Sequence, residues 1–119
     1  MDIDHFKKIN DTYGHDQGDK ALQNITAVIS SQFRKHDICC RVGGEEFMIF
    51  VATDDVKTVY AAAEELRQSI ELFYQDSMKI TVSIGVSFFT HDSTDIETVI
   101  KLADMKLYQA KAQGRNQVC

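Results

Sequence analysis

The chain has 119 residues and a formal net charge of −5, which argues against broad electrostatic binding to nucleic acid or to anionic membranes. Apolar residues make up 44% and charged residues 26%, so the composition is that of one globular domain and excludes a disordered chain. No apolar stretch reaches the length of a membrane span.

The first half of the chain predicts a polar segment, a helix and a hairpin. Residues 2–18 are expected to combine loop and helix, and apolar residues three and four apart predict an amphipathic helix over 19–35, with Asp19 at the N-cap position. Two apolar runs at 38–42 and 47–51 predict strands joined in a tight β-hairpin. Cys39 and Cys40 are interpreted as packing residues of the first of these strands, since free cysteine is usually buried, and no zinc-binding pattern is present.

The second half predicts a helix over 54–73, a strand over 80–88 with strict alternation, and a helix over 95–112 that stops at Gly114. With a strand before Asp2 the order would be βαββαβ, an α/β (α+β) fold with a ferredoxin-like, palm-like sheet and helices packed on it. Only Met1 precedes the acidic segment, so the first strand is expected to be largely missing and the backbone groups of its neighbours exposed.

The turn of the hairpin, Gly43-Gly44-Glu45-Glu46, places two adjacent carboxylates between two strands. Their mutual repulsion favours a bound cation, and Mg²⁺ binds through one or two carboxylates together with substrate phosphates. The alternative is that both are ordinary solvated turn residues, as charged residues at a hairpin tip usually are. The turn therefore indicates a site that binds a metal ion and a nucleotide. Other motifs in the chain are needed to support this interpretation.

Three separated motifs support it: the run 2–11 with Gly14-His15 and Gly18-Asp19, the turn 43–47, and the tail 108–116. In this order and spacing they resemble the GGDEF family of diguanylate cyclases across residues 1–119, without the family's usual N-terminal helix and most of its first strand. The resemblance implies condensation of two GTP into cyclic di-GMP with release of two pyrophosphates. It also implies a homodimer with one GTP on each domain, an upstream sensory or receiver domain, and a cytoplasmic location, with any membrane anchor on another domain.

The resemblance also implies the site residues. Two Mg²⁺ or Mn²⁺ ions would be held by Asp2, the carbonyl of Ile3, Glu45 and Glu46, with Glu45 as general base. The residues expected to contact GTP are Asn10 and Asp19 at the guanine, His15, and, at the triphosphate, Phe6, Lys7, Lys111 and Arg115. Lys111 and Arg115 would share a helix face only if the last helix continues past Gly114.

Arg34 and Asp37 match the RxxD inhibitory site at which the family binds its product, and Arg67 is a weaker candidate for the same site. Asp4, His5 and Asp11 are expected to make only local hydrogen bonds. Two other functions stay open. One is a non-catalytic cyclic di-GMP receptor that uses Arg34 and Asp37, and the other is a polymerase-like nucleotidyltransferase acting on another nucleotide.

Because the first strand is expected to be incomplete, weak or absent cyclase activity is expected of this chain. Unusual strand pairing or a domain-swapped association is expected to compensate for the lost strand.

Overall fold

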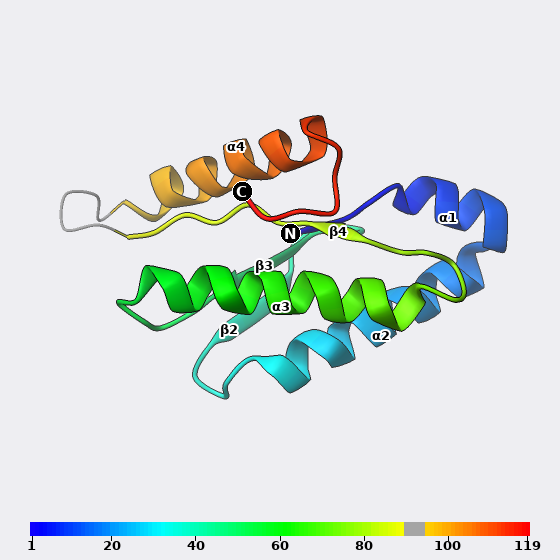
Figure 1. The fold of residues 1–119 in the computed structure, drawn as a ribbon, viewed down its shortest axis with the longest axis horizontal. Coiled ribbons are helices and arrows are strands. Elements are labelled where there is room, and N and C mark those ends of the chain that lie inside the picture. Colours follow the sequence, from blue (N-terminus) through cyan, green and yellow to red (C-terminus); the bar gives the residue numbers. More distant parts are fainter. Residues whose placement is uncertain (90–94) are drawn as a thin grey trace.

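The computed structural model describes residues 1–89 and 95–119 and has an α+β fold (Figure 1). Its elements are β1 (Asp2–Ile3), α1 (Phe6–Tyr13), α2 (His15–Gln32), β2 (Ile38–Arg41), β3 (Phe47–Phe50), α3 (Val56–Tyr74), β4 (Val82–Ser83) and α4 (Ile96–Ala112). The predicted helices and the hairpin are confirmed, with changed ends. Within the two described ranges, none of the helices combines the length and apolar character needed to cross a bilayer.

The N-caps explain where α3 and α4 begin. The Asp55 side chain accepts a hydrogen bond from the Lys57 backbone N–H, and Asp95 accepts from the Glu97 and Thr98 N–H groups. Such a cap satisfies donors that have no partner inside the helix. Helix α2 begins at His15 because Gly14, with φ +88°, separates it from α1. The prediction that Asp19 caps this helix is therefore wrong, since Asp19 lies inside it.

Strands β2 and β3 form the predicted antiparallel hairpin, with a register from Ile38↔Phe50 to Arg41↔Phe47. Within the described part of the chain, β2 pairs with β3 alone, so β2 is the outer strand, and all four of its residues are exposed. Cys39 and Cys40 are exposed as well, and the prediction that they pack inside is wrong. The apolar pattern identified a strand but could not show that this strand lies at the edge.

Strand β1 occupies the centre of the sheet although it is short. It pairs antiparallel with β4 through Asp2↔Ser83 and Ile3↔Val82, and on its other side Asp2 forms an antiparallel bridge with Glu46. The Ile3 N–H donates to the Glu45 carbonyl at 3.2 Å. The two-stranded sheets β1–β4 and β2–β3 are thus joined at the Asp2–Glu46 bridge, in the spatial order β4–β1–β3–β2. Asp2 and Ile3 therefore keep part of the first strand, because their backbones pair with neighbouring segments on both sides.

The segment predicted as one strand over 80–88 is extended, but only Val82–Ser83 pairs with β1. The C-terminal residues pair with its next part: the Ile84 N–H donates to the Gln117 carbonyl at 3.0 Å and the Val86 N–H to the Cys119 carbonyl at 2.7 Å. Helix α4 approaches this segment so closely that a Cβ on Gly85 would lie 2.1 Å from the Ala103 carbonyl oxygen. Glycine is therefore required there for space.

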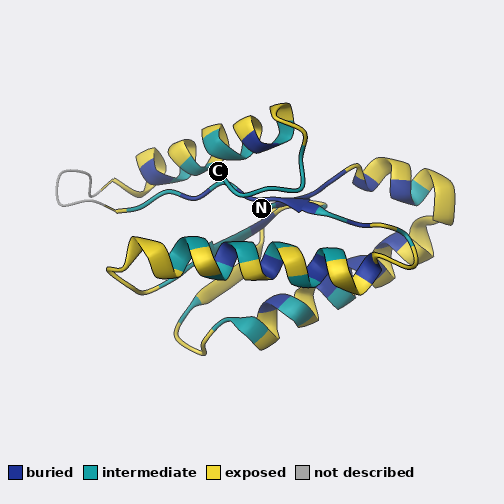
Figure 2. Ribbon diagram, viewed as in Figure 1, coloured by how far each residue is buried: buried dark blue, intermediate teal, exposed yellow. Residues whose placement is uncertain are grey.

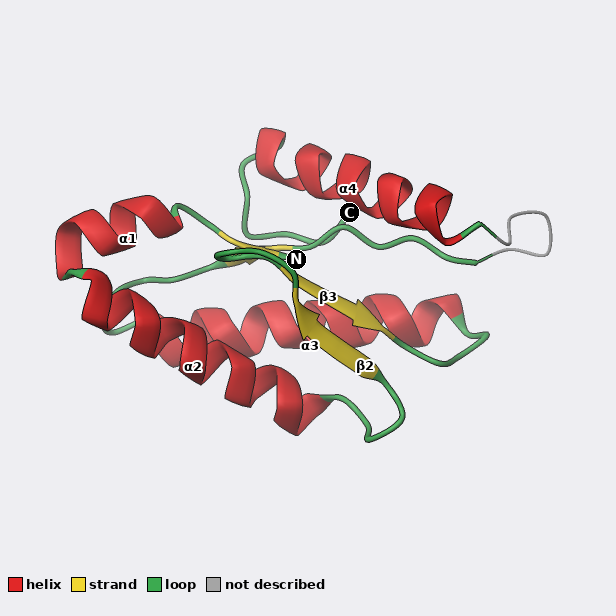
Figure 3. Ribbon diagram, turned by 180° about the vertical axis from the view of Figure 1, so that it is seen from behind, coloured by secondary structure: helices red, strands yellow, loops and turns green. Residues whose placement is uncertain are grey.

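Helix α3 and the sheet enclose the core. In Figures 1 and 3 the β4 segment runs between α3 and α4, and Figure 2 shows buried positions recurring along one side of α3. Among the most deeply buried apolar side chains are Ile25, Leu66, Ile70, Ile80 and Val82, each at most 1% exposed. Burying each such side chain fully contributes about 1.5–3 kcal/mol. This core fixes β1, and with it Asp2, against the hairpin.

A cavity of about 400 Å³ lies beside β1, between β3 and the segment 84–89. Its lining is mainly apolar and includes Ile49, Val86 and Phe88, with Leu107 contributed by α4. Met1 also lines the cavity and pairs with β3, since its nitrogen donates to the Phe47 carbonyl at 3.0 Å. The cavity therefore continues the line of β1 between two extended segments.

Candidate active site

The turn between β2 and β3 is held by hydrogen bonds to its own backbone. The Val42 N–H donates to the Glu46 carbonyl at 2.9 Å, and the Arg41 guanidinium donates to the carbonyls of Gly43 and Gly44 at 2.7–3.1 Å. A Cβ on Gly43 would lie 2.7 Å from a Glu46 carboxylate oxygen. Arg41 was not predicted as a site residue, since its only signal in the sequence is a cation just before a glycine turn. Its contacts fix the backbone that carries Glu45 and Glu46.

Asp2 is the buried acid of this region. Its side chain is 9% exposed, and one carboxylate oxygen lies 3.0 Å from Nζ of Lys111, which extends from the last turn of α4. Paired residues of an antiparallel bridge carry their side chains on the same face, so Asp2 and Glu46 share a face of the sheet. The bridge therefore joins Glu46, rather than Glu45, to Asp2.

The Ile3 carbonyl faces the turn. In an antiparallel strand the N–H and C=O of one residue point to the same side, and the Ile3 N–H donates to Glu45. Across the described residues, no three His, Cys, Asp or Glu side chains gather as a metal-binding group. The groups near the turn that could bind a metal ion are nevertheless oxygen atoms of Asp2, Ile3, Glu45 and Glu46, the type of ligand that hard divalent cations prefer. Lys111 already supplies a positive charge to Asp2.

Asn10 lies on α1 and packs against α2. Its Oδ1 atom is buried and has no hydrogen-bond partner among the described residues, and a Cβ on Gly18 would lie 1.8 Å from it. Buried acceptors without a partner are rare in folded proteins. Because of the short distance to Oδ1, position 18 has room only for glycine. The Oδ1 atom of Asn10 remains an acceptor without a hydrogen bond from any residue that the structure describes.

The other predicted nucleotide contacts lie near the start of the two N-terminal helices. His15 and Asp19 are exposed and four residues apart on α2, so they share a face. Helix α1 begins at Phe6 without a side-chain cap, which leaves the N–H groups of its first turn, including Lys7, without intrahelical partners. Such a helix start can bind an anion.

Helix α4 ends at Ala112, and Arg115 follows in a left-handed turn with φ +66°. Lys111 and Arg115 therefore do not share a helix face, because Gly114, with φ +117°, has already turned the chain. They remain neighbours: the Arg115 guanidinium donates to the Lys111 carbonyl at 3.4 Å. The turn rather than the helix thus brings the Arg115 side chain to the backbone of Lys111.

The predicted inhibitory site is assembled only in part. The Asp37 side chain is 3% exposed, and its two oxygens accept hydrogen bonds from the Arg34 N–H at 2.9 Å and the Ala52 N–H at 3.2 Å. Burial would raise its pKa, but these two N–H groups outweigh burial and hold the pKa of the Asp37 carboxyl below its ordinary value. Asp37 therefore ties the loop before β2 to the chain after β3.

Arg67 is committed elsewhere. Its guanidinium donates to Glu64, Glu71 and Asn116, and its side chain is 12% exposed. In the described ranges the polar contacts of Arg67 do not include Arg34 or Asp37. The structure thus gives no support to Arg67 as a third member of the inhibitory site.

Asp4 was expected to bond locally, and this is wrong. Its carboxylate accepts hydrogen bonds from Thr81, Ser83 and the Asn116 N–H, residues at least 77 positions away. The polar positions of the alternating run 80–88 were visible in the sequence, but nothing there indicated which acid they would meet.

Comparison with known proteins agrees with this geometry. Residues 1–117 match the family described as "Diguanylate cyclase, GGDEF domain". The chain is 39% identical to a probable diguanylate cyclase, DgcT, of Escherichia coli, over 99% of this chain and 27% of that protein. It is 40% identical to a diguanylate cyclase of Vibrio cholerae, over 100% of this chain and 38% of that protein. The chain thus spans about a quarter to two fifths of these relatives.

Solved structures show the same fold. The active GGEEF domain of a diguanylate cyclase from Vibrio cholerae superposes with a TM-score of 0.91 at 40% identity, covering 99% of this chain and 77% of that one. The GGDEF domain of DgcB from Caulobacter crescentus, solved with c-di-GMP, superposes with a TM-score of 0.86 at 33% identity, covering 98% and 72%.

Proposed function

The chain belongs to the GGDEF family of diguanylate cyclase domains, and we propose that it binds one GTP and joins it to a second GTP as cyclic di-GMP, releasing two pyrophosphates. The observation that carries this proposal is the corner formed by Asp2, the Ile3 carbonyl and the Glu45-Glu46 turn, with Lys111 3.0 Å from Asp2. It combines oxygen ligands for a cation with cationic side chains for a phosphate. Both are needed where a phosphoryl group is transferred.

Asp2, the Ile3 carbonyl, Glu45 and Glu46 are the residues that would hold two Mg²⁺ or Mn²⁺ ions. When bound, such ions neutralise charge on the attacking and leaving oxygens of an in-line displacement. Glu45, half-buried at the turn, is the candidate general base for the 3′-hydroxyl. Lys111 would leave Asp2 for the triphosphate, together with Arg115, Lys7 and the free N–H groups at the start of α1.

Guanine would be bound between α1 and α2. The Asn10 acceptor is buried against Gly18, so its amide would turn outward to meet the base, while Asp19 offers a carboxylate on an exposed helix surface. Guanine presents N–H donors at N1 and N2, which both side chains can accept, whereas adenine does not present this pair. His15, one turn before Asp19, lies where it can add a contact.

Catalysis would use two copies facing each other about a two-fold axis, each with its own GTP. The spatial order β4–β1–β3–β2 supports the ferredoxin-like assignment of the sheet. An association in which another copy adds an extended segment beside β3 stays part of the proposal. A sensory or receiver domain in a longer protein and a cytoplasmic location stay part of the proposal.

A second candidate is a receptor that binds cyclic di-GMP without making it. The DgcB domain that this chain resembles was solved with c-di-GMP, which favours binding of that ligand by the fold. Arg34 is exposed and free to contact it, while Asp37 acts through the loop it holds. The same site would give product inhibition in a cyclase.

The test measures GTP turnover with Mg²⁺ or Mn²⁺ through the release of pyrophosphate and of cyclic di-GMP. We expect weak turnover by the chain, in keeping with its short first strand, loss of at least about a hundredfold in Glu45→Gln, and no change in Glu65→Gln, an exposed acid on α3. GTP should outcompete ATP. Absence of turnover combined with binding of cyclic di-GMP that Arg34→Ala abolishes would establish the receptor instead, and turnover of ATP would indicate another nucleotidyltransferase.

A further inference from the structure

The turn that follows α4 is conformationally strained. Gly114, Arg115 and Asn116 have φ values of +117°, +66° and +48°, so three consecutive residues lie in the left-handed region. For residues other than glycine this conformation costs of the order of 1–2 kcal/mol each. Such a turn persists only if surrounding contacts hold it.

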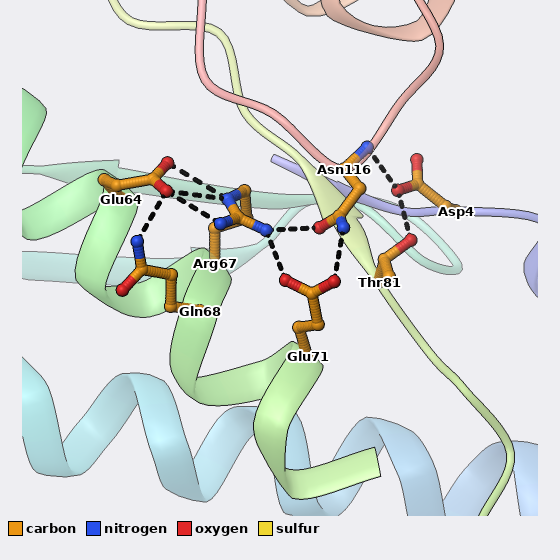
Figure 4. Close-up of polar contacts among 7 residues, drawn as sticks. All are labelled: Asp4, Glu64, Arg67, Gln68, Glu71, Thr81 and Asn116. Atoms are coloured by element: carbon orange, nitrogen blue, oxygen red, sulfur yellow. Dashed lines mark hydrogen bonds and ion pairs between the residues drawn. The ribbon is translucent and has the colours of Figure 1, made fainter. Parts of the chain in front are cut away.

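The side chain of Asp4 holds the turn by accepting a hydrogen bond from the turn's backbone. The Asn116 N–H donates to Oδ2 of Asp4 at 3.1 Å, and Asp4 is 4% exposed. The hydroxyls of Thr81 and Ser83 donate to the same carboxylate, each at 2.7 Å (Figure 4 draws Thr81). Asp4 is thus fixed to the β4 segment, two residues from Asp2, and it fixes the turn in the same position.

Arg67 and Glu71 hold the turn through the side chain of Asn116. Nη1 of Arg67 donates to Oδ1 of Asn116 at 2.7 Å, and Nδ2 of Asn116 donates to Glu71 at 2.7 Å (Figure 4). Arg67 is held in turn by Glu64 and Glu71 along α3. The hydrogen bond from Arg67, followed by that from Asn116, keeps the pKa of Glu71 below its ordinary value.

These contacts lie directly beside the two candidate phosphate ligands. Arg115 is the residue before Asn116, its N–H donates to the Ala110 carbonyl at 2.9 Å, and its guanidinium reaches the Lys111 carbonyl. Lys111 is the cation that pairs with Asp2. Whatever fixes Asn116 therefore fixes the position of Arg115 relative to Asp2.

We propose that Arg67, Asn116 and Asp4 form a clamp that positions Arg115 and Lys111 for the triphosphate of GTP. This inference rests on the proposed function, because it assigns positioning residues to the same site. Arg67 is thereby a positioning residue of the active site and not a contact for the product. None of the three clamp residues needs to touch the nucleotide.

The competing interpretation is that the clamp only stabilises the C-terminal part of the fold. A purely structural role would weaken the binding of every nucleotide to the same extent, or of none. A positioning role would weaken a triphosphate more than GMP, because GMP offers Arg115 and Lys111 one phosphate in place of three and keeps its guanine contacts at Asn10 and Asp19. Comparing a triphosphate with GMP therefore separates the two interpretations.

The decisive variants are Asn116→Gly and Arg67→Met. Glycine tolerates the left-handed conformation of position 116 and removes only the side-chain link, while methionine keeps the length of Arg67 without its donors. Arg67→Lys is the conservative variant that can keep one donor. Gln68→Ala is the matched control, since Gln68 bonds Glu64 in the same network but does not contact the turn (Figure 4).

Calorimetric titration with Mg²⁺ and a GTP analogue carrying a methylene bridge between the α- and β-phosphates provides the measurement, with GMP as the second ligand. We expect Kd for the analogue to rise roughly three- to tenfold in Asn116→Gly and Arg67→Met, less in Arg67→Lys, and not in Gln68→Ala. Kd for GMP should stay within about twofold. Equal changes for both ligands, or none, would overturn the proposal.

Amide hydrogen exchange gives a readout that needs no nucleotide. Exchange at residues 114–117 should accelerate in both decisive variants while exchange at Val82 and Ser83 stays slow; unchanged exchange in the turn would show that there is no clamp. If the unmodified chain binds the analogue no more tightly than GMP, the proposed function fails. The positioning role is then wrong as well, even if amide hydrogen exchange shows that the clamp contacts exist.

Discussion

Lys111 places its ammonium group 3.0 Å from the buried carboxylate of Asp2, joining the end of α4 to the first strand across almost the whole length of the chain. The pair offsets the charge of an acid that is largely buried. It also means that two residues proposed for different partners, a metal ion and a phosphate, hold each other in the ligand-free chain.

Replacing Lys111 with methionine should therefore destabilise the fold. We expect the free energy of unfolding in urea to fall by about 1–2 kcal/mol, since Asp2 loses its partner while Lys111 is partly solvated. Saturating Mg²⁺ should restore stability to the variant more than it stabilises the unmodified chain, because a divalent cation then replaces the missing charge. Lys101→Gln, at an exposed position on the same helix, is the control. Equal stability of Lys111→Met and the unmodified chain in the absence of Mg²⁺ would contradict the argument.

Gly18 is expected to tolerate no side chain while Asn10 is present. A Cβ there would lie 1.8 Å from Oδ1 of Asn10, so Gly18→Ala should reduce stability by about 1–3 kcal/mol despite the better helix propensity of alanine. In the double variant with Asn10→Ala, the loss should largely disappear, because the clashing amide is gone. A double-mutant cycle of unfolding free energies measures this coupling, and additive effects would show that the contact is not responsible.

Asp37 should contribute stability that depends on pH. Its carboxyl has a lower pKa in the folded chain than in the unfolded chain, so the folded state binds the proton less tightly. Its contribution is then fully present above the unfolded pKa of about 4 and is lost as the pH falls through the lower, folded pKa. Asp37→Asn should cost about 1 kcal/mol at neutral pH and flatten the decline of stability in acid. Asp54→Asn, in an exposed loop, should change neither the stability at neutral pH nor its decline in acid. If stability declines in acid as steeply in Asp37→Asn as in the unmodified chain, Asp37 does not have this role.

Arg41 should control the order of the turn that carries Glu45 and Glu46. Arg41→Met removes three hydrogen bonds to the carbonyls of Gly43 and Gly44, and we expect faster amide exchange at residues 43–46. Turnover of GTP should fall by roughly tenfold, because the candidate base is no longer held in place. Lys35→Gln, another exposed cation, is the control. Unchanged exchange in the turn would mean that the glycine backbone holds its shape without Arg41.

The elements that the sequence predicted well are those with a local cause. The hairpin follows from two apolar runs around a glycine turn, and α3 and α4 follow from helical periodicity with an aspartate at each N-cap. The motif 43–47, with the acidic run and the basic tail, also indicated the family that the comparison shows. Periodicity, caps and turn residues act over a few positions, so one chain is enough to detect them.

Only the tertiary structure decided which distant residues meet. That β2 lies at the edge and exposes Cys39, that the C-terminal residues pair with Ile84, and that Asp4 bonds to Asn116 all depend on the packing of the whole sheet. The same is true of Lys111 and Asp2, and of Arg67, a weaker candidate for the product site that donates a hydrogen bond to Asn116 in the folded chain. Amino-acid sequence specifies such contacts through the core that brings the segments together. The residue types therefore indicated the chemistry of the site, while the packing determined which of those residues act together.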